Sequence, residues 1–404
     1  MKIVEVETFV VGNPPPGFGG RYFLFVKLTT DDGVTGLGEV YAATFRPQVM
    51  VAAIEDLADQ CLVGEDPFHI ERFWRRAYSR GLTQRPDTTL QGAMSGLEMA
   101  CWDIIGKACN KPVYELLGGR VHEALRAYTY LYPEPDDATD IYLDPDLAAQ
   151  RAGEYVARGF TGVKFDPAGP YTSMGGHQPS LERIELSVRF CAAIREAVGD
   201  SADLLFGTHG QFTSSGAIRL ARRLEPFDPL WFEEPVPPDN IPEMAKVAHQ
   251  TSIPIATGER LTTKAEFARV LEAKAASILQ LNLGRSGGLL EGKKIAAVAE
   301  VFGAQIAPHC YCGPVVGAAN AHLAAASPNF LILECIQDWG GFHADLLETP
   351  LQVQDGYMVL PTEPGLGVTL DEAVARAHPY HGDETHLVVH DDPIDVADRG
   401  VVNP

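Results

Sequence analysis

Two carboxylates stand at the ends of short apolar runs in the middle of the chain. Glu233 follows Trp-Phe and precedes Glu-Pro, and Glu259 closes the run Ile-Ala-Thr-Gly-Glu. Such runs are typical of buried parallel strands, and a barrel enzyme carries its chemistry at the C-terminal ends of these strands. One strand-helix unit separates the two residues, so adjacent strand ends could direct both side chains at one point. Two such carboxylates repel each other unless a cation lies between them, and oxygen-seeking Mg²⁺ is the expected cation.

Polar or ionisable side chains also end the other apolar runs in this part of the chain. They are Lys164, Asp166, His209, Asn282, His309 and Glu334. Taken singly, a buried His is more often a satisfied core residue, and a Lys or Asn at a strand end is more often a solvated residue or a cap. A succession of strands that all end this way is harder to explain by packing. If the strands form one barrel, all of these side chains face the same mouth.

The elements that must position these residues are strands that alternate with amphipathic helices. Eight apolar runs have strand character: Leu125–Leu131, Gly162–Asp166, Asp203–Thr208, Leu230–Glu234, Pro254–Glu259, Ser277–Asn282, Ala304–His309 and Phe330–Cys335. Repeated strand-helix units of this kind predict a closed parallel α/β barrel, which we assign to residues 123–345.

The first 122 residues have a different pattern. Strand-like alternation marks Lys2–Val11, Arg21–Thr30 and Gly36–Val40. With a hairpin turn at Asp32-Gly33, these runs predict an antiparallel sheet, and the helical period from Pro47 to Gly119 predicts helices beside it. We therefore expect residues 1–122 to form an α+β domain. The segment 346–404 has too few apolar residues for a core of its own, so we expect it to return to that domain.

The composition excludes several classes of partner. The 404-residue chain has a net charge of -22 and no cluster of Lys and Arg, so we expect neither a nucleic-acid nor a membrane partner. No run reaches the roughly 18 uncharged apolar residues of a membrane span, and the start of the chain is too acidic for a signal peptide. The seven cysteines are scattered, as expected of reduced thiols in a cytoplasmic enzyme.

The ordered set of motifs resembles the enolase superfamily, in the branch of mandelate racemase, muconate lactonizing enzyme and the acid-sugar dehydratases. The motifs are Trp-Phe-Glu233-Glu-Pro, Thr-Gly-Glu259-Arg, Gln-Leu-Asn282-Leu-Gly-Arg-Ser-Gly-Gly288, Ala-Pro-His309, Gly33–Glu39, and Ser95–Gly119 around Trp102-Asp103. The resemblance covers nearly the whole chain. It implies a capping domain of sheet and helices, completed by the C-terminal tail, over a modified TIM barrel of the (β/α)7β type. It also implies a Mg²⁺ ion, abstraction of a proton α to a carboxylate, and a symmetric homo-oligomer.

The resemblance also implies roles for the residues at the mouth. Glu233 and Glu259 would bind the metal, which stabilises the charge that develops on the substrate carboxylate. Lys164 and His309 would reach the substrate from opposite sides, one as base and the other as acid. Glu334 would bond a carboxylate oxygen or a hydroxyl of the substrate.

Three positions depart from the family pattern. Relatives have a third metal carboxylate where this chain has Gly207. We expect His209 as the substitute and Asp166 as the second choice, although relatives use a His at the position of His209 as an acid. Asp166 also stands where many relatives have a second Lys, which argues against a racemase with two bases. Asn282 replaces an Asp that charges the neighbouring His, so we expect His309 to be less basic than usual and to act as acid, with Lys164 as base.

Segments around the mouth look like those of the 3,6-anhydrogalactonate cycloisomerases and neighbouring sugar-acid dehydratases. The segments are Val163–Tyr171, Gly207–Gln211 and Trp339–His343. Both reactions give a 2-keto-3-deoxy sugar acid, and they differ in whether water or a ring oxygen leaves. We expect one of them on an acid sugar, and the alternatives are a racemase or epimerase of a 2-hydroxy acid and a non-catalytic sugar-acid binder. Candidate substrate contacts are Phe18 in a mobile flap, Tyr171 and His177 in the loop Pro167–Pro179, Asn282 and Trp339.

Overall fold

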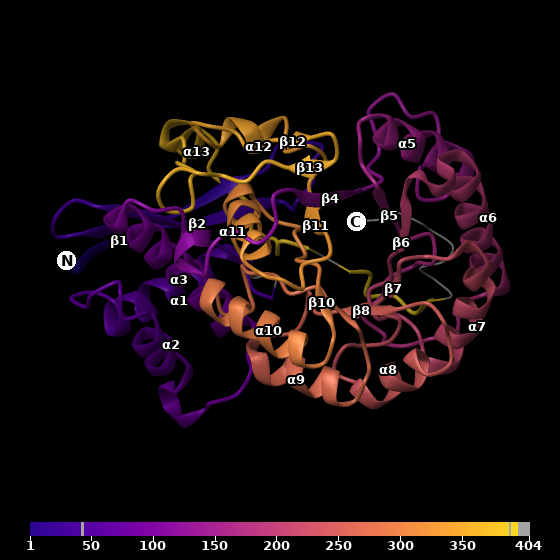
Figure 1. Ribbon diagram of the computed structural model, residues 1–404, viewed down its shortest axis with the longest axis horizontal. Coiled ribbons are helices and arrows are strands. Elements are labelled where there is room, and N and C mark those ends of the chain that lie inside the picture. Colours follow the sequence, from indigo (N-terminus) through magenta and orange to yellow (C-terminus); the bar gives the residue numbers. More distant parts are fainter. Residues whose placement is uncertain (42–43, 388, 395–404) are drawn as a thin grey trace.

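The computed structural model describes residues 1–41, 44–387 and 389–394. A small sheet with its helices lies at the N-terminal end of the molecule, beside a larger ring of strands and helices (Figure 1). The protein thus has the predicted architecture, an N-terminal capping domain and a C-terminal TIM barrel.

The capping domain contains a three-stranded antiparallel sheet and four α-helices. Its elements are β1 (Ile3–Gly12), β2 (Tyr22–Thr30), β3 (Thr35–Val40), α1 (Pro47–Cys61), α2 (Ile70–Tyr78), α3 (Thr88–Cys109) and α4 (Val113–Leu116). The side chain of Asp87 caps the start of α3, and Asn110 ends the helix in the left-handed conformation. Glycines let α3 lie directly on β3, because a Cβ on Gly38 would come within 1.9 Å of the Gly96 carbonyl oxygen. The helix is therefore buried on nearly every side.

The barrel contains eight parallel strands. They are β4 (Leu125–Tyr130), β5 (Gly162–Phe165), β6 (Asp203–Phe206), β7 (Trp231–Glu233), β8 (Ile255–Thr257), β9 (Ile278–Leu279), β10 (Gln305–Ile306) and β11 (Leu333–Cys335). Neighbours along the chain pair in order from β4 to β10, and β11 pairs with β4. The parallel bridge between Ile306 and Phe330 joins β10 to the segment before β11 and so completes the ring.

Seven helices surround the strands, one after each strand from β4 to β10 (Figure 1). They are α5 (Pro145–Ala157), α6 (Leu181–Val198), α7 (Ser214–Leu224), α8 (Ile241–Ala248), α9 (Thr263–Glu272), α10 (Leu289–Val301) and α11 (Pro314–Ala325). This is the predicted (β/α)7β arrangement, in which the last strand has no barrel helix after it.

Most of the strands predicted from the sequence end one to three residues later, on the mouth side, than the corresponding strands of the structure. The regular ladder ends earlier, although single backbone bonds continue past it, as from the His309 amide to the Leu281 carbonyl (3.1 Å). Of the polar residues predicted at strand ends, Lys164, Glu233 and Glu334 are therefore paired in the ladder, and the others lie just past it.

The C-terminal segment contacts both the barrel and the capping domain. It contains α12 (Phe342–Asp345), β12 (Val353–Gln354), β13 (Tyr357–Met358) and α13 (Glu372–Ala377). Strand β13 pairs antiparallel with β4. Farther along, Tyr380 donates its amide to the carbonyl of Val10 on β1 (3.0 Å).

Two buried carboxylates of the capping domain bind the amino ends of barrel helices. Glu39 accepts hydrogen bonds from the amides of Gly313 and Val316 at the start of α11. Glu98 accepts from the amides of Leu289 (2.7 Å) and Leu290 (2.9 Å) at the start of α10. Because the first amides of a helix lack partners within the helix and favour negative charge, these two contacts fix the capping domain on the barrel.

The seven cysteines form no disulfide. The sulfur atoms of Cys310 and Cys312 lie 3.7 Å apart and are buried. Among the helices described, none combines the length and apolar character that crossing a membrane requires.

Candidate active site

The predicted acidic and basic residues meet at the mouth of the barrel through a chain of short contacts. Lys164 Nζ lies 2.6 Å from Glu233 Oε1 and 3.8 Å from Glu334 Oε1. His309 Nε2 lies 3.2 Å from Glu259 Oε2 and 3.8 Å from Glu334 Oε2. Lys164 and His309, which come from β5 and the end of β10, therefore converge on the two oxygens of Glu334.

Glu233 is fully buried and accepts hydrogen bonds from three side chains. They are Lys164 (2.6 Å), Gln280 (2.7 Å) and the indole of Trp231 (3.1 Å). Burial alone would lower the pKa of Lys164, but the carboxylates of Glu233, Glu334 and Glu259 outweigh it and raise that pKa above its ordinary value. Lys164 is therefore protonated while these carboxylates face it.

The orientation of His309 follows from its contact with Asn282. The Asn282 side-chain oxygen accepts from the amide of Gly284 (2.8 Å), so the Asn282 nitrogen faces His309 Nδ1 (2.9 Å). Nδ1 must then be an acceptor, and the proton of the neutral ring is on Nε2, toward Glu259. Burial lowers the pKa of His309, which favours this neutral form.

Asp166 lies in a separate polar cluster with two tyrosines and His209. The hydroxyls of Tyr130 and Tyr171 both donate to its carboxylate. His209 Nδ1 lies 3.7 Å from Asp166 Oδ2, and the His209 ring meets that of Tyr171 edge-on. Burial raises the pKa of Asp166 to about 8, although the hydrogen bond from Tyr171 lowers it. At Gly207, a Cβ would lie 3.3 Å from both Asp166 Cβ and Lys164 Cε, so these two side chains occupy the space beside the missing carboxylate.

The donor set fits Mg²⁺ with two protein carboxylates. In the part of the chain that the structure describes, no three His, Cys, Asp or Glu side chains are grouped to hold a metal ion. His209 as a third ligand therefore stays a prediction. Glu233 and Glu259 nevertheless offer buried hard oxygen atoms, and Mg²⁺ is commonly held by one or two carboxylates while keeping several waters.

The other predicted substrate contacts lie at the edges of the mouth or away from it. Phe18 stacks on Tyr132 with ring centroids 4.2 Å apart. His177 is half-buried and packs edge-on against Phe212. Trp339 is 1% exposed and packs in the core next to Gly317.

Sequence reasoning missed three residues that hold the predicted ones. Trp231 and Gln280 bond Glu233, and Tyr130 bonds Asp166. Trp231 and Gln280 each stand two residues before a predicted site residue, on the same side of an extended strand. The two-residue period of a strand could therefore have indicated that Trp231 and Gln280 face the site. Nothing in the spacing of Tyr130 indicates its contact with Asp166.

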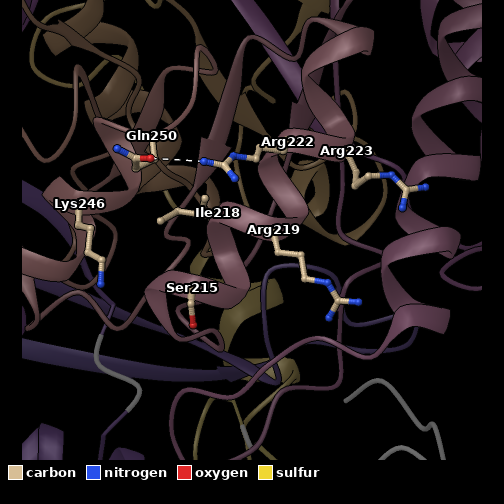
Figure 2. Close-up of a pocket in the computed structure, with 7 residues that line it drawn as sticks. All are labelled: Ser215, Ile218, Arg219, Arg222, Arg223, Lys246 and Gln250. Atoms are coloured by element: carbon tan, nitrogen blue, oxygen red, sulfur yellow. Dashed lines mark hydrogen bonds between the residues drawn. The ribbon is translucent and has the colours of Figure 1, made fainter.

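A second hollow lies on the outer surface of the barrel, against α7 and α8 (Figure 2). Its volume is about 610 Å³, and its lining residues are Ser215, Ile218, Arg219, Arg222, Arg223, Lys246 and Gln250. None of the residues predicted at the strand ends contributes to it. The acidic mouth, and not this cationic hollow, is therefore the candidate active site.

Known proteins share both parts of this chain. The family described as "Enolase C-terminal domain-like" matches residues 147–374, and "Mandelate racemase / muconate lactonizing enzyme, N-terminal domain" matches residues 18–118. A D-xylonate dehydratase of Haloferax volcanii is 34% identical over 95% of this chain and 90% of its own length. A D-galactonate dehydratase of Ralstonia nicotianae is 36% identical over 93% of each chain.

Solved structures match the whole fold. A protein from Labrenzia alexandrii DFL-11, described as a mandelate racemase/muconate lactonizing enzyme, is 62% identical and covers 98% of this chain and 100% of its own, with a TM-score of 0.95. A mandelate racemase/muconate lactonizing enzyme from a Sulfitobacter species is 57% identical with a TM-score of 0.96, over 98% of this chain and 100% of its own.

Proposed function

Because the chain belongs to the mandelate racemase and muconate lactonizing enzyme family of the enolase superfamily, we propose that it is a Mg²⁺-dependent lyase acting on an acid sugar. It removes the proton α to the carboxylate and then expels a β oxygen, giving a 2-keto-3-deoxy sugar acid. The dehydratase names of its relatives support this reaction class, and the leaving oxygen is either water or a ring ether.

The observation that carries the proposal is the convergence of Lys164 and His309 on Glu334. Each proton-bearing nitrogen lies 3.8 Å from a different oxygen of that carboxylate. An acid and a base that reach one point are the two groups that a β-elimination requires. Both carboxylate oxygens of Asp166 accept a tyrosine hydroxyl bond, so neither is open to a substrate proton, and this argues against racemisation.

Glu233 and Glu259 would hold the Mg²⁺ ion, which when bound supplies a positive charge beside the substrate carboxylate. Lys164 takes the α-proton as a neutral amine. Its side chain must therefore first move away from the carboxylates that keep it protonated. The electron pair of the C–H bond forms the new double bond as the bond from Cβ to oxygen breaks. His309 acts as the acid in its protonated form, giving its Nε2 proton to the departing oxygen and returning to the neutral ring.

Proton NMR in D₂O with Mg²⁺ tests the proposal on a panel of pentonates, hexonates, hexarates and 3,6-anhydrohexonates. We expect one substrate to give a deuterated 2-keto-3-deoxy acid, and its identity names the leaving group. Exchange of the α-proton without product would instead show a racemase or epimerase. If protein that measurably binds Mg²⁺ reacts with none of these compounds, the proposed substrate class is refuted.

Variants connect the reaction to the mouth. Glu233→Gln and Glu259→Gln should abolish turnover while the protein remains folded, and Lys164→Ala should lose α-proton exchange. Glu243→Gln is the matched control, because Glu243 bonds Ser214 and Lys246 on the outer surface. Normal turnover in either mouth variant would refute the proposed metal site.

A further inference from the structure

The last part of the described chain crosses from the capping domain to the mouth of the barrel. It begins on β1, where Pro379 forms an antiparallel bridge with Val11. At its other end, the His390 carbonyl accepts from the amide of Ser173 (2.8 Å), and the His390 amide donates to the carbonyl of Tyr171 (3.3 Å). The segments 379–387 and 389–391, here together termed the tail strap, therefore end on the loop whose Tyr171 hydroxyl bonds Asp166.

Ion pairs hold the middle of the tail strap beside the flap. Asp383 lies 3.2 Å from the guanidinium of Arg46, and Glu384 lies 3.3 Å from that of Arg21. Arg21 directly follows the flap, Asn13–Gly20, which contains Phe18. Because these pairs are largely exposed, they guide the strap and add little stability.

His386 is the side chain that the tail strap buries. It is 4% exposed, and its ring lies edge-on to those of Tyr22, Tyr41 and Tyr311. The flap lies directly on the imidazole, because a Cβ at Gly20 would come within 1.9 Å of the His386 ring. Only a glycine allows this approach, so the flap and the tail strap form one cover.

His386 lies on the His309 side of the mouth. The ring of Tyr41 is 5.1 Å from that of His386 and 5.9 Å from that of His309. The ring of Tyr41 thus lies between the two histidines and contacts both. A substrate with its carboxylate at the metal ligands would present its distal hydroxyl groups toward the cover.

The Nδ1 atom of His386 has no hydrogen-bond partner among the described residues. An unpaired buried nitrogen costs free energy unless a ligand or water satisfies it. Burial lowers the pKa of His386 to about 3, so the ring is neutral and suits a hydroxyl better than an anion.

We propose that His386 is a specificity-determining residue that hydrogen-bonds a distal hydroxyl of the acid sugar, with the tail strap placing it under the flap. This inference rests on the proposed lyase function. It concerns which sugar is accepted and assigns His386 no part in moving protons.

The experiment compares the sugar acid found by NMR with analogues that lack one distal hydroxyl. His386→Phe keeps an aromatic ring against the tyrosines but removes both nitrogens, and His386→Asn keeps a hydrogen-bonding group. We expect His386→Phe to lower kcat/KM roughly 5- to 100-fold for the full substrate, mainly through KM, with little change for one deoxy analogue. His386→Asn should recover part of the loss. His381→Ala, an exposed histidine of the same strap, should match the wild type.

The two proposals fail in different ways. Equal losses of kcat/KM on the full and every deoxy substrate, or no loss at all, would overturn the role of His386 and leave the lyase function standing. Absence of any acid-sugar turnover by the wild type would overturn both. If His386→Phe does not fold, His386→Leu replaces it, because it also removes both ring nitrogens, and unchanged selectivity in that variant would overturn the inference.

Discussion

The buried pair of Lys164 and Glu233 makes a quantitative prediction for the metal-free protein. Removing one member of a buried ion pair typically costs about 3–5 kcal/mol, because the other charge is left unpaired. Here the cost is reduced, since Lys164 keeps Glu334 at 3.8 Å and Glu233 keeps its bonds from Trp231 and Gln280. We expect Lys164→Met and Glu233→Gln each to lower the free energy of unfolding by about 2–4 kcal/mol. The double variant should cost about 2–3 kcal/mol less than the sum of the two.

Urea denaturation in EDTA, followed by circular dichroism and by tryptophan fluorescence, measures this coupling. Additive single-variant effects, within about 0.5 kcal/mol, would refute the conclusion that the two charges stabilise each other. The matched control is the surface pair of Lys246 and Glu243, at 3.3 Å, for which solvent screening predicts no measurable coupling. Saturating Mg²⁺ should reduce the coupling of the buried pair, because Glu233 then has a second cation to bind.

Three further predictions concern the proposed acid at the mouth, the contact between the two domains and the packing inside the capping domain. Asn282→Asp places a carboxylate on His309 and should raise the pKa of His309. The fall of kcat/KM on the alkaline side should then move to higher pH, and an unchanged pH profile would exclude His309 as the acid. Glu98→Ala leaves the first amides of α10 unpaired and should lower the free energy of unfolding by about 2–4 kcal/mol in urea titrations. The control is Glu115→Ala on the exposed surface of α4, and a loss for Glu98→Ala no larger than for this control would contradict the capping role. Gly38→Ala should lower the melting temperature by several degrees in calorimetry, because its Cβ would collide with the backbone of α3, and an unchanged melting temperature would disprove the close packing.

The barrel could be predicted from the sequence because its signals are local and repeated. Each strand is a short apolar run followed by an amphipathic helix, and a parallel sheet buried on both faces requires that pattern. The ends of the strands were less predictable. Asn282 and His309 lie three residues past the last paired residue of β9 and β10, because the length of a ladder depends on the neighbouring strand as well as on local sequence.

The contacts inside the mouth were only partly predictable. The acidic and basic residues at the strand ends could be named from their spacing, since parallel strands place their ends together. The pairing of these residues could not be predicted, because Lys164 had several carboxylates within reach and three-dimensional packing selected Glu233 and Glu334. The position of His386 was inaccessible from the sequence for a similar reason, since it reaches the flap across more than three hundred intervening residues.

A barrel of this fold cannot be recombined freely with capping domains from its relatives. Glu39 and Glu98 belong to the capping domain, yet each completes the first turn of a barrel helix. Glu39 also bonds the amide of Gly313, four residues after His309, so a foreign capping domain without this carboxylate would disturb the segment that carries the proposed acid. A functional chimera therefore has to inherit both carboxylates with the barrel helices that they bind, which makes the two domains a single unit of exchange.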